Sequence, residues 1–372
     1  MKCIISKSTN FEKIFKLRNF PIFMGVTKKY KKKIERKNLI FWINKTTGTV
    51  QIHPKVKLEK LYKYSHGSGT VGKTWINHHH FFFNFIRENL IGKILEIGAG
   101  NNSIISKFKN LDKVDKFYSI GKNIDEQNKN NKIKIIDDFF SKKIIKKKIN
   151  TKIDTVVHSH FFEHVYSPNK FLEDVYSILS EGGYQCFSVP NMTEMLKLKQ
   201  ANAVNFEHPY YYDREMIKYL LQSNGFKIIK IKKFLKSHSI MYITKKTNSF
   251  KKKKYSKYLK NKKIFTNLHS TWNKDKEKIE NYLSNKKDIF LFGAHIFSQV
   301  ILHLLNKKEN IKGVLDNDKN KINKYLNGSK LKVYNPSILK KHDEPYVYMR
   351  VGAYAKEIKK QVLLINKKTK FI

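Results

Sequence analysis

The stretch Ile94-Leu95-Glu96-Ile97-Gly98-Ala99-Gly100 decides the fold of this chain. It predicts a short buried strand with a carboxylate near its end, then a glycine turn and the start of a helix. Gly98 and Gly100 let the backbone turn tightly and approach a ligand closely, because neither carries a Cβ. The free N–H groups at the start of the next helix would point at that ligand. A plain strand-to-helix turn is the alternative interpretation of the same residues.

Two details narrow the identity of the ligand. Position 103 is Ser, where a dinucleotide-binding fingerprint has its third Gly. Glu96 lies two residues before Gly98, so its carboxylate can face a cationic group. S-adenosylmethionine (SAM) carries an ammonium and a sulfonium, which suits this pattern better than NAD does. We therefore expect SAM as the cofactor, in contact with Glu96, Gly98, Ala99 and Gly100, with other nucleotides or a structural turn as alternatives.

The composition indicates several soluble domains. At 372 residues and 40% hydrophobic content, the chain exceeds one typical core, and we expect two or three domains. The formal charge of +46 comes almost entirely from Lys spread along the whole chain. Proteins that read nucleic acids concentrate their charge and use Arg for bidentate contacts. A nucleic-acid partner is therefore not expected, whereas an anionic small-molecule substrate is favoured.

Cysteine usage and hydropathy indicate the compartment. Cys3 and Cys186 are the only cysteines, so a disulfide framework is excluded and a reducing compartment is indicated. The N-terminus lacks the apolar stretch of a signal peptide, and no run approaches the ~20 apolar residues of a membrane span. We expect a cytoplasmic protein without a membrane partner. The oligomeric state is not indicated.

Residues 1–72 predict a small β-rich module. Apolar runs at 38–43 and 49–53 flank a turn at 45–48, which is typical of a hairpin. Tyr64 precedes a glycine-rich loop, which is either a linker or a segment that covers the substrate and brings the Tyr64 hydroxyl near the chemistry. A helix is expected over 73–89, with adjacent histidines at 78–80. Neighbouring helical residues point about 100° apart, so these three histidines cannot bind one metal together and are interpreted as surface or packing residues.

From residue 91 onward, strands alternate with helices. Strands are expected at 94–97, 116–120, 132–136, 153–157 and 184–189, with a helix over 171–179 that is capped at its C-terminus by residues 181–183. The alternation predicts a parallel sheet covered by helices on both faces. Ligands of such folds bind at the carboxyl ends of the strands. That edge adds four residues to the expected cofactor site: Asp137, Asp138, His158 and His160.

Two further clusters were weighed for chemistry. Residues 158–164 contain His158, His160, Glu163 and His164, but their spacing matches no zinc pattern, and we expect no metal. The pair Glu207-His208 lies among aromatic residues. A neighbouring carboxylate can orient a histidine or raise its pKa, so His208 is either a general base or a buried structural histidine.

The C-terminal part repeats the strand–turn–helix theme. A helix is expected at 216–224, strands at 227–231 and 240–244, and a Lys-rich surface connector over 246–263, followed by a helix at 268–284. A strand at 288–292 then leads into a glycine turn and a helix at 296–305. We assign a central domain to 73–248 and a second, smaller Rossmann-like domain to 249–372. Asp316, at the end of the second strand of this domain, either holds a ribose or caps a turn.

Taken together, these motifs resemble a family of SAM-dependent methyltransferases that methylate a carbon of a nucleotide-linked sugar. The resemblance spans nearly the whole chain, and its motifs are residues 94–100, 154–191, 205–208 and 292–318. It implies an α/β protein in which a class I Rossmann-like methyltransferase domain lies between a zinc-ribbon-like module and a smaller Rossmann-like domain, with the substrate between the parts. It further implies that His208 of the Glu207-His208 pair is the base, and that Tyr64 is the family's loop tyrosine.

Three departures from the family pattern are visible. Relatives hold zinc with a Cys-x-x-Cys pair and later cysteines, whereas Cys3 is followed by Ser6, and Val26 and Asn44 occupy the later positions. One remaining cysteine cannot form a tetrahedral thiolate site, so no zinc is expected. Asn205 stands where sugar-modifying relatives often have Tyr. The acid expected after the second strand is also missing, and Asn123 or Asp125 would have to replace it.

The expected reaction is methyl transfer to a sugar carbon. In this hypothesis His208 removes a proton from the carbon beside a sugar carbonyl, and the resulting enolate takes the methyl group of SAM. The first alternative keeps the fold and methylates a hydroxyl or amine of a sugar. The others are a degenerate, non-catalytic binding protein and a protein that binds or modifies RNA.

Overall fold

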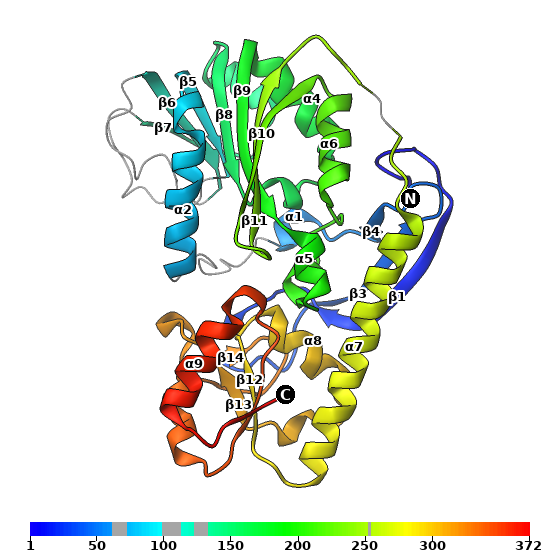
Figure 1. Ribbon diagram of the computed structural model, residues 1–372, viewed down its shortest axis with the longest axis vertical. Helices are drawn as coiled ribbons and strands as arrows, with labels where there is room; N and C mark the ends of the chain where they lie inside the picture. Colours follow the sequence, from blue (N-terminus) through cyan, green and yellow to red (C-terminus); the bar gives the residue numbers. More distant parts are fainter. Residues whose placement is uncertain (62–72, 99–112, 123–132, 252–253) are drawn as a thin grey trace.

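The structure, a computed structural model, describes residues 1–61, 73–98, 113–122, 133–251 and 254–372. Three parts are visible in Figure 1: a large sheet domain, a smaller sheet domain, and an N-terminal module beside the long helix that connects to the smaller domain. The predicted α/β class is thus confirmed, with two Rossmann-like sheets in one chain.

The N-terminal module is a three-stranded antiparallel sheet of β1 (Phe11–Pro21), β3 (Arg36–Asn44) and β4 (Val50–Ile52), in the order β1-β3-β4. The predicted hairpin is β3–β4, in which Trp42 pairs with Gln51. Its core-facing side chains alternate along the strands, and Leu39, Phe41 and Ile43 are buried. A short helix, α1 (Leu58–Leu61), follows this sheet.

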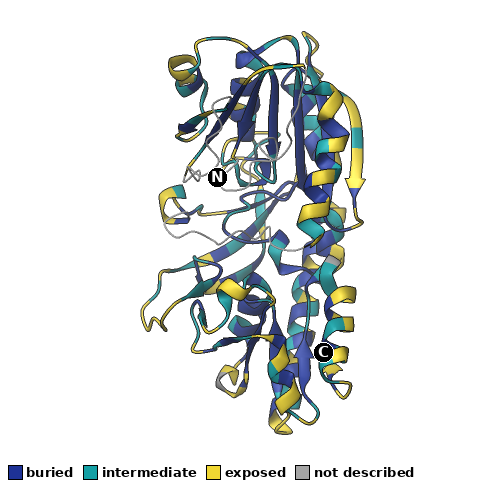
Figure 2. Ribbon diagram, turned by 90° about the vertical axis from the view of Figure 1, so that its left-hand side faces the viewer, coloured by how far each residue is buried: buried dark blue, intermediate teal, exposed yellow. Residues whose placement is uncertain are grey.

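The central domain is a seven-stranded sheet in the order β10-β11-β9-β8-β5-β6-β7. Strands β5 to β9 are parallel, and β11 runs antiparallel between β9 and β10. Figure 2 shows the inner strands as buried and the surrounding helices as exposed on their outer faces, whereas the edge strand β10 is mostly exposed. The bounds are β5 (Gly92–Ile97), β6 (Val114–Gly121), β7 (Ile133–Asp137), β8 (Ile153–Ser159), β9 (Leu179–Pro190), β10 (Phe226–Phe234), β11 (Ser239–Lys246), α2 (Lys73–Ile86), α3 (Lys142–Lys148), α4 (Pro168–Ile178), α5 (Met192–Lys197) and α6 (Arg214–Ser223).

The expected helix cap at 181–183 is wrong. Helix α4 ends at Ile178, and Leu179 is already extended and forms the first residue of β9. Leu179 is fully buried and pairs with Ile153 on β8. Burial of this side chain in the sheet therefore ends the helix before the glycines, and Gly182 adopts its positive φ of 70° within the strand.

The C-terminal domain is a five-stranded parallel sheet in the order β15-β13-β12-β16-β17. Helix α7 (Tyr258–Ser284) precedes it and begins inside the segment that was predicted to be a connector. Its apolar residues recur on one face, where Phe265, Leu268 and Trp272 are buried, while its lysines lie outward. The remaining bounds are β12 (Ile289–Phe292), α8 (Ile296–Leu304), β13 (Gly313–Leu315), β14 (Tyr325–Leu326), β15 (Val333–Tyr334), β16 (Tyr346–Tyr348), α9 (Ala355–Ile365) and β17 (Lys370–Phe371).

The N-terminal module is joined to the C-terminal domain by strand pairing and hydrogen bonds. Its short strand β2 (Val26–Thr27) pairs with β14 rather than with its own sheet. The carbonyl of Phe23 accepts hydrogen bonds from Gln299 Nε2 and Asn327 Nδ2, at 3.2 and 2.9 Å. These contacts place the two smaller parts together against one end of the central domain, where the cavity described next is found.

Candidate functional site

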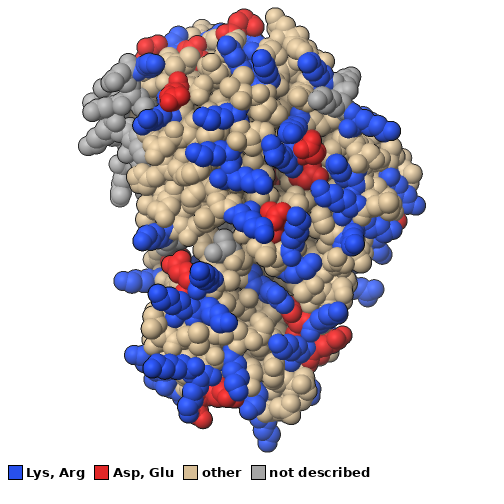
Figure 3. All heavy atoms as spheres, in the orientation of Figure 1, with Lys and Arg blue, Asp and Glu red and all other residues tan. Residues whose placement is uncertain are grey.

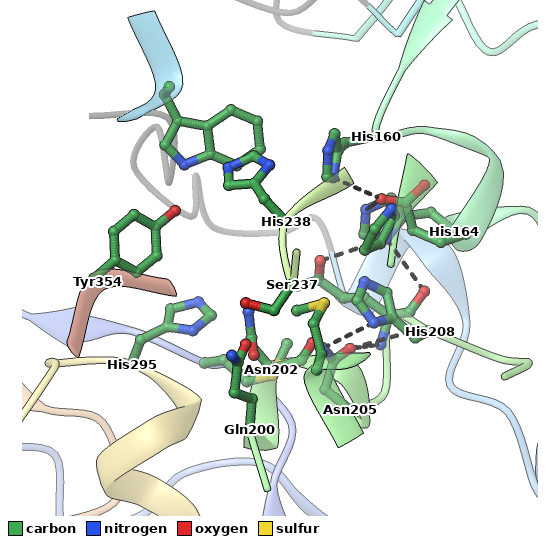
Figure 4. Close-up of a pocket in the computed structure, with 16 residues that line it drawn as sticks. His160, His164, Gln200, Asn202, Asn205, His208, Ser237, His238, His295 and Tyr354 are labelled. Atoms are coloured by element: carbon green, nitrogen blue, oxygen red, sulfur yellow. Dashed lines mark hydrogen bonds and ion pairs between the residues drawn. The ribbon is translucent and has the colours of Figure 1, made fainter. Parts of the chain in front are cut away.

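A cavity of about 300 Å³ lies where the three parts meet. The N-terminal module contributes Met24, and the C-terminal domain contributes His295 and Tyr354. Figure 4 shows His295 and Tyr354 facing the histidines of the central domain across the cavity. The lining residues are Met24, Trp75, His160, Glu163, His164, Pro190, Met195, Gln200, Asn202, Asn205, Glu207, His208, Ser237, His238, His295 and Tyr354.

The cavity adjoins the carboxyl edge of the central sheet. Strands β5 and β8 are parallel neighbours, with Ile97 opposite His158, so the chain segments that leave them emerge at the same edge. His160 follows β8 directly and adopts a φ of 48°, in the left-handed region, which turns the chain away from the strand. The predicted glycine turn and His160 thus lie at one edge of the sheet.

Glu163 is an ionised carboxylate buried beneath the cavity. Its side chain is only 2% exposed, and Oε1 lies 3.3 Å from His160 Nδ1. Burial alone would raise the pKa of Glu163, but the hydrogen bond with His160 and the nearby His164 and His208 outweigh it and lower the pKa to about 2. Oε2 has no hydrogen-bond partner among the described residues. The site therefore contains a negative charge beside three imidazoles.

His208 has one ring nitrogen fixed by the backbone. Its Nδ1 lies 3.1 Å from the carbonyl oxygen of Ala203, so Nδ1 carries the proton and donates it. The unprotonated Nε2 therefore has a lone pair that can accept a proton. Burial, followed by the proximity of His164, lowers the pKa of His208 to about 4. A neutral imidazole with a defined tautomer is the form that a general base requires.

Asn205 shapes the loop that carries His208. Its Oδ1 accepts the backbone N–H groups of Glu207 and His208, at 2.7 and 3.1 Å, and its Nδ2 donates to the carbonyl of Asn202. This position, where relatives often have Tyr, is thus occupied by a buried amide that holds the turn. The amide fixes the backbone from which the His208 ring projects.

Glu207 lies beside His164. The Nδ1 of His164 donates to the backbone carbonyl of Glu207 at 3.2 Å and lies 3.7 Å from its carboxylate. The rings of His164 and His208 are 5.0 Å apart. The Glu207–His208 pair expected from the sequence is therefore part of a larger group that also contains Glu163 and His164. In this group the two carboxylates lie beside the two histidines. His164 was named in the sequence as a metal candidate but not as a site residue.

The predicted cofactor turn is described only at its start. Gly98 has a φ of 74°, and a Cβ built on it would lie 2.3 Å from Cδ2 of Phe161. Glycine is therefore required here both by the backbone conformation and by the ring above it. Glu96 is 3% exposed on β5, next to this turn. Ala99, Gly100 and Tyr64 lie outside the described residues.

The other predicted cofactor residues differ in exposure. Asp137 and Asp138 end β7 at the surface, where Asp137 lies 3.9 Å from Lys122 Nζ. His158 is fully buried, and its ring stacks on Phe187 at 4.8 Å. His158 does not line the cavity, because its ring is packed among the rings of Phe161, Phe162, Phe171 and Phe187. His160, two residues further on, does line it.

Several lining residues were missed by the sequence analysis. His295 follows the glycine turn after β12, a position that resembles the first cofactor turn and could have been proposed. His238 and Ser237 lie in the turn between β10 and β11, where the sequence carries no signal of a site. Tyr354 and Gln200 come from different domains and line one cavity only because the domains pack together.

The seven-stranded sheet with its antiparallel hairpin, and the glycine turn after its first strand, define a Rossmann-like methyltransferase. Residues 72–231 match the family model of a methyltransferase domain, and residues 232–372 match that of a C-methyltransferase C-terminal domain. The chain therefore carries a methyltransferase domain followed by a C-methyltransferase C-terminal domain. The boundary between the two matches falls within β10, although the sheet continues to Lys246.

Solved structures with a similar central domain include methyltransferases of several bacteria. A SAM-dependent methyltransferase from Clostridium acetobutylicum is 15% identical, over 51% of this chain and 96% of its own, with a TM-score of 0.36. The N-methyltransferase NodS from Bradyrhizobium japonicum, in complex with S-adenosyl-L-homocysteine, is 9% identical, over 47% and 88%, with a TM-score of 0.36. A search of curated proteins gave no match. Among the described residues, no helix combines the length and apolar character needed to span a membrane.

Proposed function

We propose that the protein transfers a methyl group from SAM to a carbon of a nucleotide-linked keto sugar bound in the cavity. The observation that carries this proposal is the neutral His208, whose Nδ1 is fixed by the carbonyl of Ala203. A carbon next to a carbonyl becomes a methyl acceptor only after it loses a proton. His208 is the residue of the cavity best prepared to take that proton.

The described part of the cofactor site fits SAM. The left-handed turn at Gly98, packed against the ring of Phe161, follows β5 at the edge where cofactors bind, and the buried Glu96 carboxylate beside it can face the ammonium of the methionine end. Asp137 or Asp138 at the end of β7 is placed to hold the adenine or the ribose. When bound, SAM supplies an electrophilic methyl group.

The residues around His208 stabilise the proton that it takes up. Nε2 of His208 receives the proton from the substrate carbon, and the imidazolium that forms is attracted by the nearby Glu163 carboxylate. Glu207 adds a second negative charge to this group through His164. The removal of the proton leaves an enolate carbon as the methyl acceptor, so the protein's contribution is positioning plus one base.

The carrier nucleotide is assigned to the side of the cavity formed by the C-terminal domain, where His295 and Tyr354 line the wall. Asp316, at the end of β13, accepts the N–H of Ala294 at 2.7 Å and pairs with Lys321 at 3.2 Å. These contacts favour the turn-capping role for Asp316 over ribose binding.

Transfer to a sugar hydroxyl or amine is the alternative, and the buried amide of Asn205 favours it, because relatives that modify sugar carbons often have a tyrosine there. His208 would again act as the base. NMR of the product separates the two reactions, because a carbon-bound methyl group has a different shift and coupling from one on oxygen or nitrogen.

Replacement of His208 tests the proposal. His208→Ala should lower kcat by about 10²- to 10⁴-fold, because a general base contributes rate enhancements of that size. Calorimetry should show unchanged SAM affinity, because the cofactor turn belongs to a different part of the site. Full activity of this variant would remove the base role, and loss of SAM binding would instead indicate a structural effect.

A further inference from the structure

Three histidines from distant parts of the chain face one another at the edge of the cavity. His78 lies on α2, His160 follows β8, and His238 lies in the turn between β10 and β11. Their ring centroids are 5.3 Å apart for His78–His160, 5.1 Å for His78–His238 and 5.7 Å for His160–His238. One nitrogen of each ring lies within 4.8 Å of the others. The three imidazoles therefore surround a common point.

Two of the three rings, those of His78 and His238, have ring nitrogens without a hydrogen-bond partner among the described residues. Both nitrogens of His78, and Nε2 of His238, are buried and have no partner among the described residues. His78 is fully buried and His238 is 6% exposed. Buried polar groups are nearly always hydrogen-bonded, and one left without a partner requires a specific explanation. Packing alone does not explain why three ring nitrogens of one buried cluster lack partners.

His78 and His238 are held in the neutral form that binds metals. Burial, and then the neighbouring histidines, lower the pKa of His238 to about 3 and lower that of His78 strongly as well. Imidazole coordinates a metal through a deprotonated nitrogen, so these rings need not lose a proton on binding.

Polar neighbours orient two of the rings. Ser239 Oγ lies 2.6 Å from Nδ1 of His238 and 2.8 Å from Nε2 of His160. The Glu163 carboxylate lies 3.3 Å from Nδ1 of His160. A carboxylate or hydroxyl on the second nitrogen of a histidine ligand is the usual way in which proteins fix its ring and increase its basicity. With Ser239 on Nδ1, His238 directs Nε2 at the shared point. Both nitrogens of His160 have partners, so His160 would bind the metal through Nε2 in exchange for its contact with Ser239, with Glu163 kept on Nδ1.

We propose that His78, His160 and His238 bind a divalent transition metal, and that zinc fits the ligand set best. Three imidazoles are a common protein set for zinc, with bonds of about 2.0–2.1 Å and a fourth position left open. His160 and His238 line the cavity, so that position faces it and can take water or a ligand oxygen. The site lies beyond the proposed methyl transfer. The sequence does not predict this site, because its three histidines come from segments that are far apart in the chain.

Cobalt binding tests the proposal directly. The full chain, purified without a polyhistidine tag and stripped of metal by a chelator, is titrated with Co²⁺ while its visible d–d absorption is recorded, and Zn²⁺ is then added as a competitor. One Co²⁺ per chain should bind in a tetrahedral environment, and Zn²⁺ should displace it. His78→Ala and His238→Ala should each weaken Co²⁺ binding by about 100-fold or more, since even outer-shell changes cost 10- to 100-fold.

Neighbouring residues provide the controls. His80 is exposed on the same helix and lies outside the cluster, so His80→Ala should bind Co²⁺ like the native chain. Trp75 gives a second readout, because its ring lies 4.7–5.2 Å from the three imidazoles, and bound Co²⁺ should quench its fluorescence. Trp75→Phe should lose that quenching and keep the absorption band.

The outcomes separate this site from its neighbour. Glu163, His164 and His208 form a second group of possible ligands, which contains the proposed base. Loss of Co²⁺ binding in His164→Ala, with binding retained in folded His78→Ala, would place the metal there and overturn the proposal. Absence of a d–d band in the native chain would overturn it as well. His78→Gln, with circular dichroism to verify folding, replaces His78→Ala if that variant does not fold.

Discussion

At the scale of single residues, one hydrogen bond sets the protonation state of His208. Donation to the carbonyl of Ala203 requires the proton on Nδ1, and burial then disfavours a second proton on Nε2. The ring is therefore neutral over the whole physiological range. The same burial makes His208 a weaker base before it takes up a proton. Once the imidazolium forms, the negative charge of the Glu163 carboxylate stabilises it and offsets part of this effect.

The pH dependence of activity follows from this state. The pKa of His208 is lowered to about 4, so the base-competent neutral form persists down to that pH and is lost as the pH falls through it. We expect kcat/KM to stay nearly constant from pH 8 to about pH 5.5 and to decline around pH 4. Short initial-rate assays, with circular dichroism at each pH, measure the profile. An acid limb centred at the ordinary histidine value of about 6.5 would contradict the assignment.

Gly98 is a second residue with a measurable role. Gly98→Ala places a Cβ 2.3 Å from the ring of Phe161 in a left-handed backbone conformation. We expect a loss of about 2 kcal/mol in stability and a weaker affinity for SAM, measured by thermal melts and calorimetry. Gly182→Ala is the matched control, because φ is 70° there but the nearest atom is the flexible Lys245 Cε at 3.3 Å. Equal effects of the two variants would show that only backbone strain matters.

At the scale of elements, the local sequence pattern correctly predicted the strands of the central sheet but placed the ends of some helices wrongly. The predicted strands at 94–97 and 153–157 correspond to β5 and β8, because a parallel strand that is buried on both faces has a nearly continuous run of apolar residues. The first turns of α7 were predicted to be a surface connector because they are rich in lysine. The buried apolar face of the helix, which includes Phe265, is difficult to recognise among those lysines. The pairing of β2 with β14 joins residues about 300 positions apart, and no local signal specifies it.

The same contrast holds for the site. Glu207 and His208 were named from the sequence because an acid beside a histidine is a local feature that suggests a base. The approach of His164 to them depends on how the loop after β8 meets the loop after α5, and His238 reaches the cavity through the turn of a hairpin. Such contacts are set by packing between elements, which one sequence does not reveal.

The N-terminal module uses a hydrogen-bond network at a position where relatives have a zinc ligand. Asn44 is fully buried, accepts from Thr46 N, Thr47 N and Thr47 Oγ1, and donates to the carbonyl of Asn10. The Thr47 hydroxyl in turn lies 3.4 Å from Cys3 Sγ. The network thus ties the hairpin turn to the start of the chain.

Asn44→Ala should therefore weaken this module. It leaves several buried groups without partners, and we expect a loss of about 2–3 kcal/mol, seen as a lower Tm. Asn38→Ala is the control, because Asn38 is exposed and accepts a single bond from Asn19 N. A Tm equal to that of the control would show that the network does not support the fold.

At the scale of the whole molecule, charge and domain contacts have separate roles. Figure 3 shows Lys and Arg distributed over the visible face of both sheet domains. A dispersed positive surface attracts anionic substrates from solution without defining a groove for nucleic acid. The cavity depends instead on how closely the domains approach, and Gly352 lies at one contact between them.

Gly352 of the C-terminal domain lies against Gln200 of the central domain. Its φ is 58°, and a Cβ built on it would lie 1.4 Å from Gln200 Nε2, in the wall of the cavity. Gly352→Ala must therefore push the domains or the Gln200 side chain apart. We expect kcat/KM for a nucleotide-linked substrate to fall by about tenfold or more, because small misplacements of a bound substrate are costly. SAM affinity should be unchanged, because the turn at Gly98 belongs to the central domain.

The double variant Gly352→Ala, Gln200→Ala separates the two causes. Removing the Gln200 side chain eliminates the collision, so activity should recover in part relative to Gly352→Ala alone. Gln200→Ala by itself reports the loss of the side chain without the collision. Activity that stays as low in the double variant as in Gly352→Ala would mean that strain at the positive φ, rather than the approach of the domains, limits the reaction.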